Sequence, residues 1–342
     1  MSITQFTSSD IAIDLGTSST RVFVKGRGIV VNEPSVVAYK AQSNGKIVAV
    51  GDVAEEIAGR SGNQLRLERP IRGGKVIDLE TAQLMVQYFV NKALGSVRLK
   101  PRVLGTEPIG STRMESAMLV RTLESVGVRK HAQVDQIIAS GLGAGLSIYE
   151  PQGNFVVDIG AGKTEIALLS MGGVVLSSSK PIAGNQIDVA IGEYVVRQYG
   201  IQIVGRVAEQ IKFDLIDVRQ SASPDRTIIV RGRDVVTGMP TVADVSLAGI
   251  CEAIHDVLSQ IAEAIQSVLS RTPPELCQDV LRNGITLCGG TSRLPKIDEV
   301  FAEAFGIPVH VSSSGGDCAV LGAGYMTDHY DMFSGSAFPV KE

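Results

Sequence analysis

The stretch Asp158–Glu165, "DIGAGKTE", contains the Gly-Lys-Thr that closes a P-loop, and its context decides the fold. A P-loop has a glycine five positions before the Gly-Lys pair, where this chain has Val157. A P-loop also opens a helix, so that backbone N–H groups and the helix dipole face the phosphate. Here "NFVVD" precedes the turn and "TEIALLS" follows it, and both segments have the pattern of strands. The turn therefore joins two strands, which argues against a P-loop.

A second copy of this turn lies 144 residues earlier in the chain, where Asp14 opens "DLGTSSTRVFVKGRGIVV". The later copy, from Asp158, reads "DIGAGKTEIALLSMGGVV". The offset aligns Gly16 with Gly160, Thr20 with Thr164, and Gly28 with Gly172. Each copy consists of a strand, a glycine turn, a second strand, a second glycine turn and two valines. A repeat of half the chain predicts two similar α/β halves and not a solenoid.

The bulk composition excludes several classes of protein. The 342 residues are enough for two domains of about 150 residues each. The net charge is −4, whereas a protein that binds nucleic acid is expected to carry a basic surface. The four cysteines, at 251, 277, 288 and 318, form no CxxC pair, which favours reduced thiols in a cytoplasm over disulfides or zinc. The sequence shows neither an uninterrupted apolar span nor the pattern of a signal peptide.

Strand-like segments alternate with longer helix-like segments, which indicates an α/β fold. A helix is predicted over 251–270, where apolar residues recur at helical spacing before "TPPE". Thr112 and Glu115 predict a capping box at the start of another helix, which Gly127 ends. Residues 217–226 are predicted to form an exposed loop. The predicted strands are "IAID", "RVFVK", "SVVAY", "FVVD", "EIALLS", "GVVLSSS", "TIIVRG" and "ITLC".

A hairpin turn rich in Gly, Ser and Thr can surround a phosphate with backbone N–H groups and hydroxyls. Two such turns could hold a triphosphate from both sides, and their aspartates could bind Mg²⁺ through waters. A single Asp-Gly hairpin is more often an ordinary turn, so the interpretation depends on the matched pair.

These motifs resemble those of bacterial actins of the MreB family, within the superfamily of actins, sugar kinases and heat-shock chaperones. "DLGTSST" and "DIGAGKTE" match its two phosphate hairpins, and "GITLCGGTSRLP" (284–295) matches its adenosine motif. The segments 24–38, 141–153, 230–240 and 271–276 are more specific to MreB, and the match covers roughly residues 10 to 327.

The resemblance implies an actin-like α/β architecture, with two duplicated domains and a nucleotide cleft between them. The first domain is expected over 1–145 with a return helix at 318–330, and its inserted subdomain at about 33–75. The second is expected over 146–317, with an insert at about 184–245, followed by a tail over 331–342.

The implied cofactors are ATP and Mg²⁺. Asp14 and Asp158 are implied as the metal-binding residues, and Gln136 and Asp158 as the catalytic ones. The residues implied to bind the nucleotide are Gly16, Thr17, Ser18, Ser19, Gly160, Ala161, Gly162, Lys163, Thr164, Gly184, Asn185, Glu209, Lys212, Gly289, Gly290 and Thr291.

Glu209 and Lys212 match residues that face ribose and adenine in the family, and they share one face of a predicted helix. The alternative is a solvated ion pair. Gly184 and Asn185 stand where the MreB pattern has Gly-Asp in a loop beside the nucleotide.

Three departures from the family pattern bear on chemistry. Asp135 and Gln136 stand where the pattern has two glutamates, and Gln136 can position water but is a poor base. Gln136 could instead cap the helix that follows. Ala161 and Lys163 replace small residues, and Lys163 could reach phosphate or point into solvent. Thr291, Ser292 and Arg293 replace a glycine run. Together these departures indicate a divergent member or a paralogue, and they bear on hydrolysis more than on binding.

The function implied by the resemblance is a weak cytoskeletal ATPase that polymerises head to tail with itself. It would organise cell shape and the cell-wall synthesis machinery, as a cytoplasmic protein peripheral at the inner membrane surface. Membrane contact could come from Met1, Ile3 and Phe6, although no basic face accompanies them. The other candidate is the aromatic tail, whose alternative is a disordered terminus; its residues are Tyr330, Phe333 and Phe338.

Other functions remain open at this point. An organelle-positioning or plasmid-segregating actin paralogue fits the same motifs. A small-molecule kinase needs a catalytic aspartate for a substrate hydroxyl, and no distinct candidate is present. A chaperone needs a further substrate-binding domain, which we do not expect here.

Overall fold

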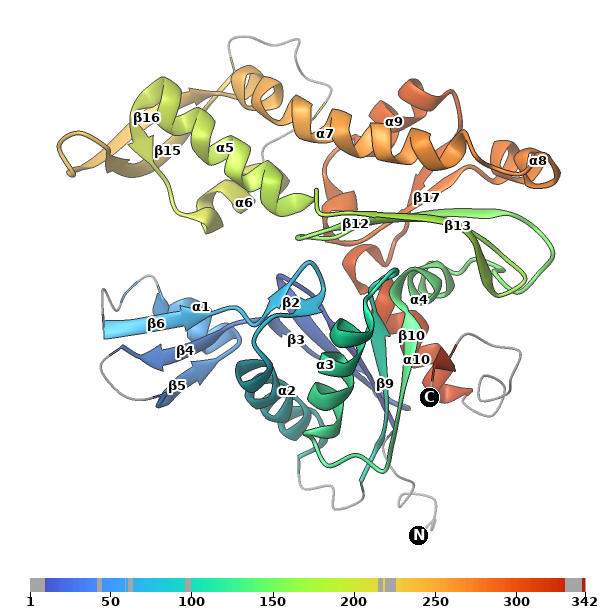
Figure 1. The fold of residues 1–342 in the computed structure, drawn as a ribbon. Coiled ribbons are helices and arrows are strands. Elements are labelled where there is room, and N and C mark those ends of the chain that lie inside the picture. Colours follow the sequence, from blue (N-terminus) through green and yellow to red (C-terminus); the bar gives the residue numbers. More distant parts are fainter. Residues whose placement is uncertain are drawn as a thin grey trace. The chain divides into compact units, whose positions relative to one another are not determined.

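The chain divides into two compact units in the computed structural model (Figure 1). Unit 1 consists of Met1–Gln152, Leu169–Val175 and Asp317–Glu342, and unit 2 consists of Gly153–Leu168 and Leu176–Gly316. The structure describes residues 10–41, 45–58, 60, 64–95, 100–214, 218, 226–329 and 340–341.

Unit 1 is built on a six-stranded sheet with the strand order β19-β10-β9-β1-β2-β3. β1 is antiparallel to β2 and parallel to β9, and β9 is parallel to β10. The polypeptide therefore leaves β1 through a tight hairpin and reaches β9 only after a long excursion. The strands are β1 (Ile11–Leu15), β2 (Ser19–Val24), β3 (Gly28–Pro34), β9 (Arg102–Glu107), β10 (Lys130–Asp135) and β19 (Val340–Lys341).

Helices cover both faces of this sheet because successive side chains of a strand point to opposite sides. Val22 and Val24 of β2 belong to a buried cluster with Met85, which lies on α2 (Leu79–Leu94). Phe23, between them, lies against α10 (Cys318–Asp328), where a Cβ on Gly324 would come within 2.6 Å of its ring. The capping box predicted from Thr112 and Glu115 is confirmed at the start of α3 (Arg113–Glu124).

The excursion between β3 and β9 contains a small sheet of its own, with the order β5-β4-β6, and a two-stranded ribbon. Its elements are β4 (Val37–Lys40), β5 (Ile47–Val50), α1 (Asp52–Ala58), β6 (Leu65–Glu68), β7 (Ile71–Arg72) and β8 (Lys75–Val76).

A crossing of two helices completes unit 1. α4 (Gln136–Gly143) follows β10 directly, and it meets α10 where both carry glycine. A Cβ on Gly143 would lie 1.9 Å from the carbonyl oxygen of Cys318, and one on Gly322 would lie 1.9 Å from that of Ala139. The two backbones are therefore in direct contact, which only glycine at both positions permits.

Unit 2 is built on a five-stranded sheet with the order β13-β12-β11-β17-β18, in which β17 is parallel to both β11 and β18. A smaller sheet has the order β14-β15-β16. The strands are β11 (Asn154–Ile159), β12 (Thr164–Ser170), β13 (Gly173–Lys180), β14 (Ile201–Gln202), β15 (Thr227–Asp234), β16 (Pro240–Ser246), β17 (Ile285–Cys288) and β18 (Val309–Val311). The helices are α5 (Gly184–Tyr199), α6 (Gly205–Asp214), α7 (Leu247–Leu269), α8 (Pro274–Asn283) and α9 (Ile297–Phe305).

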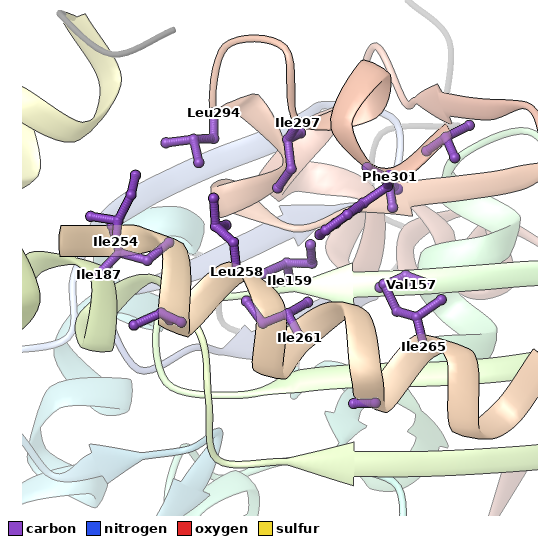
Figure 2. Packing of buried hydrophobic residues seen from close by; sticks show 14 of the residues in the cluster. Val157, Ile159, Ile187, Ile254, Leu258, Ile261, Ile265, Leu294, Ile297 and Phe301 are labelled. Carbon is purple, nitrogen blue, oxygen red and sulfur yellow. The ribbon is translucent and has the colours of Figure 1, made fainter. Parts of the chain in front are cut away.

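The core of unit 2 forms where α7 packs on the large sheet (Figure 2). The apolar stripe predicted for this helix faces the sheet, and Ile261 and Ile265 lie beside Val157 and Ile159 of β11. The helix begins at Leu247, before the predicted start at 251, because the Ser246 side chain accepts a hydrogen bond from the Gly249 N–H and caps it.

The eight predicted strands are confirmed as β1, β2, β4, β11, β12, β13, β15 and β17. The remaining strands were not predicted. Most of the predicted loop at 217–226 and of the tail at 331–342 lies outside the described residues, as do Met1, Ile3, Phe6, Tyr330, Phe333 and Phe338. Within the described part of the chain, no helix has the length and apolar character needed to cross a membrane.

Candidate functional site

The first Asp-Gly turn is a tight hairpin between β1 and β2. The Gly16 N–H donates to the Ser19 carbonyl at 3.1 Å and closes the turn. A Cβ on Gly16 would lie 2.5 Å from that same oxygen, so the turn requires glycine. At the tip, the backbone N–H groups of Thr17 and Ser18 donate to no acceptor among the described residues. Two N–H donors are thus available to an anion.

Asp14, at the end of β1, is buried and held by side chains of the same unit. The Thr106 hydroxyl donates to Asp14 Oδ1 at 2.7 Å. Arg21 Nη1 lies 3.6 Å from Asp14 Oδ2, and Arg21 Nε lies 2.8 Å from Asp317 Oδ1. The guanidinium compensates the buried carboxylate, which would otherwise be costly.

The second turn, between β11 and β12, has the same construction. The Gly160 N–H donates to the Lys163 carbonyl at 3.0 Å, and the N–H groups of Ala161 and Gly162 have no acceptor in the described part of the chain. Asp158 is the second-to-last residue of β11 and is buried, as Asp14 is in β1. Gly289 follows the parallel strand β17 with φ +86°, and a Cβ there would lie 2.5 Å from Asp158 Oδ1. Glycine therefore lets this loop approach the carboxylate.

The carbonyl of Gly160 joins three separate segments of unit 2. It accepts hydrogen bonds from the Gly184 N–H at 3.1 Å and from the Thr291 hydroxyl at 2.7 Å. The Asn185 N–H donates to the next carbonyl, that of Ala161, at 2.7 Å. The hairpin, the start of α5 and the 3₁₀ turn Gly290–Arg293 thus meet at one point. The structure brings these predicted site residues together.

Lys212 belongs to the same cluster and is buried, so the solvated pair with Glu209 considered from the sequence is wrong. Its Nζ lies 2.8 Å from Asp188 Oδ1 and donates to the Gly184 carbonyl at 3.4 Å. Burial raises the pKa of the Asp188 carboxyl above its usual range, and the Lys212 ammonium offsets part of that shift. The sequence analysis missed Asp188, which lies on α5 one helical turn after Gly184.

Two of the alternatives left open by the sequence can be decided. Lys163 does not point into solvent: its side chain is only 9% exposed and its Nζ lies 2.7 Å from Glu165 Oε2. Gln136 does not cap α4, because it is the first helical residue and the N-cap position is Asp135. The Gln136 side chain is half-buried and hydrogen-bonds to none of the described residues.

Thr106 and Glu107 are further residues that the sequence analysis did not single out. They end β9 beside the end of β1, and both are buried. Carboxyl ends of adjacent parallel strands are common places for ligands in α/β sheets, and that rule could have found them.

Each aspartate, taken within its own unit, suits a hydrated magnesium ion better than a fully protein-coordinated one. No group of three or more His, Cys, Asp or Glu that could hold a metal occurs among the described residues. Magnesium usually keeps several waters and takes one or two carboxylates, so the single buried aspartate at each hairpin is compatible with a hydrated ion.

The site residues fall into one set in each unit. Asp14, the tip residues Gly16–Ser19, and Gln136 belong to unit 1, and the others belong to unit 2. A family model described as "MreB/Mbl protein" matches residues 8–335. The chain belongs to the MreB/Mbl family.

Two curated relatives match this chain over almost their full length. This MreB/Mbl family member is 38% identical to the cell shape-determining protein Mbl of Bacillus subtilis over 94% of this chain and 96% of the relative. It is 37% identical to the cell shape-determining protein MreB of Escherichia coli over 97% of this chain and 96% of the relative.

Solved structures confirm the actin-like fold. MreB5 of Spiroplasma citri bound to AMPPNP has a TM-score of 0.89 and 31% identity, over 95% of this chain and 98% of that one. The MamK double helical filament has a TM-score of 0.78 at 23% identity, over 94% of this chain and 99% of that one, and supports the fold alone.

Proposed function

We propose that this MreB/Mbl family member is a bacterial actin that binds ATP, hydrolyses it slowly and polymerises into filaments. The observation that carries the proposal is the pair of equivalent hairpins. Each has a buried aspartate at the end of its first strand, a glycine N–H that closes the turn, and two tip N–H groups without an acceptor among the described residues. The two similar structures of MreB5 of Spiroplasma citri, one bound to AMPPNP and one to ADP, support a nucleotide as the ligand.

The hairpins would bind phosphate oxygens through the N–H groups of Thr17, Ser18, Ala161 and Gly162. Mg²⁺, when bound, neutralises phosphate charge, and Asp14 and Asp158 would hold it through waters. Lys212 would form a fixed wall beside the nucleoside, because Asp188 and the Gly184 carbonyl hold its ammonium.

Slow hydrolysis follows from the character of Gln136. An amide can orient a water molecule by donating and accepting hydrogen bonds, but it cannot take up a proton readily. We therefore propose a role for Gln136 in positioning the water and not as a base.

We also propose a cellular role in organising cell shape and cell-wall synthesis, with the filament peripheral to the inner membrane. The names of the curated relatives, "cell shape-determining", support the first part. Subunits would add by one repeated head-to-tail contact, which propagates instead of closing. The segments 33–75 and 184–245 are proposed as inserted subdomains, supported by their separate three-stranded sheets.

The experiment compares Asp14→Asn and Asp158→Asn with the wild-type protein and with Asp256→Asn, an exposed carboxylate on α7. Electron microscopy and light scattering follow assembly with Mg-ATP, and circular dichroism checks folding. We expect filaments from the wild-type and Asp256→Asn proteins and none from the two hairpin variants, because a metal-organising carboxylate contributes several kcal/mol. Normal polymerisation of both hairpin variants would show that the paired-hairpin proposal is wrong.

A further inference from the structure

Lys163 carries a buried positive charge directly after the turn of the second hairpin. The backbone fixes its place, because its carbonyl accepts the Gly160 N–H bond that closes the turn. Its Nζ lies 2.7 Å from Glu165 Oε2, with side-chain exposures of 9% for Lys163 and 1% for Glu165. Both charges are therefore largely withdrawn from water.

The pair leaves most of the hydrogen-bonding capacity of the ammonium unused. An ammonium has three N–H donors, and Glu165 is the one partner of Lys163 Nζ in the described part of the chain. The contact between Lys163 Nζ and Glu165 Oε2 lacks the geometry of a hydrogen bond. A buried ion pair is stabilising only when the remaining donors also find acceptors, so the ammonium is suited to a second anion.

The alternation of β12 separates this pair from the nucleoside side of the proposed site. Lys163 directly precedes β12 and Glu165 lies in it, and side chains two residues apart along an extended chain point to the same side. Thr164, between them, donates its hydroxyl to the Ile182 carbonyl, two residues before Gly184. Gly184, Lys212 and Thr291 therefore gather on the Thr164 side. The ammonium lies on the opposite face, beside the turn whose tip N–H groups are proposed to bind phosphate.

We propose that Lys163 senses the third phosphate of a nucleoside triphosphate. The inference rests on the proposed function. In the triphosphate state the unused N–H donors of Lys163 bind the terminal phosphate. A diphosphate offers no such oxygen, so Lys163 stays with Glu165 alone, and the preference of the chain for triphosphate over diphosphate comes largely from this side chain.

The test avoids a variant that removes Lys163 while Glu165 stays in place. Removing Lys163 alone would take away the ammonium that lies 2.7 Å from the buried Glu165 carboxylate, and breaking a buried ion pair in this way is strongly destabilising. The comparison therefore uses Glu165→Gln and the double variant Lys163→Met/Glu165→Gln, which differ only at Lys163. Lys180→Met, an exposed lysine on β13, is the matched control.

Titration calorimetry with AMPPNP and with ADP, each with Mg²⁺, gives the ratio of the two affinities for each protein. We expect Glu165→Gln and Lys180→Met to keep at least the wild-type ratio. In the double variant we expect the ratio of AMPPNP affinity to ADP affinity to be about 10- to 100-fold lower, which is the usual contribution of a hydrogen bond to a charged group.

The outcomes separate this inference from the proposed function. Equal ratios in Glu165→Gln and the double variant would mean that Lys163 only neutralises Glu165, and would overturn the inference while nucleotide binding stands. Failure of the wild-type protein to bind either nucleotide would overturn both. A lower ratio in the double variant, with the wild-type ratio kept in Glu165→Gln, supports both the inference and the proposed function.

Discussion

At the scale of single residues, Gln136 is where binding and hydrolysis can be separated. Its amide begins α4 and makes no hydrogen bond to the described residues, so it is available to a water molecule. We expect Gln136→Ala to slow phosphate release by at most roughly 10²–10⁴-fold, with ATP affinity nearly unchanged. Phosphate release and light scattering in one sample should show slower release and filaments that persist longer.

Gln136→Glu is the matched control for this prediction, because it keeps the length of the side chain and supplies a base. Its release should be as fast as that of the wild-type protein or faster. Unchanged release in Gln136→Ala would mean that the water is held by another group.

Some residues of the site could be predicted from the sequence and others could not. The repeat located Asp14 and Asp158 because a tight turn demands glycine at a fixed offset, whatever packs around it. The partner of Lys212 was not predictable, because Asp188 lies on another helix and meets it only through the packing of α5 on α6. Lys163 was undecided for a related reason: burial of a side chain next to a turn is a property of the surrounding fold.

At the scale of elements, the crossing of α4 and α10 is the tightest contact described in unit 1. Gly322→Ala places a methyl group where the Ala139 carbonyl lies 1.9 Å away, so a backbone must move. We expect the thermal unfolding midpoint of unit 1 to fall by about 2–12 °C, from the usual cost of overpacking.

Gly192→Ala provides the control for this prediction, because Gly192 lies inside α5 with nothing within 4 Å of its Cβ position. Alanine there should leave stability unchanged or raise it slightly, since alanine favours helix. A Gly322→Ala protein as stable as Gly192→Ala would contradict the close crossing.

Elements marked by local chemistry were predictable, and elements defined by distant pairing were not. The capping box of α3 needs only two residues three positions apart, so its start could be read directly. β10 has no clear alternation in "KHAQVD", and it becomes a strand because β9 pairs along one edge and β19 along the other. That second pairing joins Gln133 to Lys341, which no local pattern indicates.

At the scale of the whole molecule, each unit has its own hydrophobic core, and a nucleotide bound by both hairpins should stabilise both. We expect calorimetric unfolding in two transitions, both raised by Mg-ATP through linkage. Ile261→Ala should lower only the transition of unit 2, by roughly 4–20 °C, because it empties part of the core beneath α7.

A transition that Mg-ATP leaves unmoved would identify a hairpin that does not contribute to binding. Gly322→Ala serves here as the matched change in unit 1, and it should lower the other transition.

The glycine pair of the α4–α10 crossing also limits how the chain can recover from damage there. A clash caused by a larger side chain can usually be relieved by a smaller residue on the opposing surface. Gly143 and Gly322 already have no side chain, and each faces a carbonyl group of the other helix. A second-site suppressor of a change at either position therefore cannot act by trimming the partner. Compensating substitutions, which are possible in most of a protein core, are therefore not available where these two helices cross.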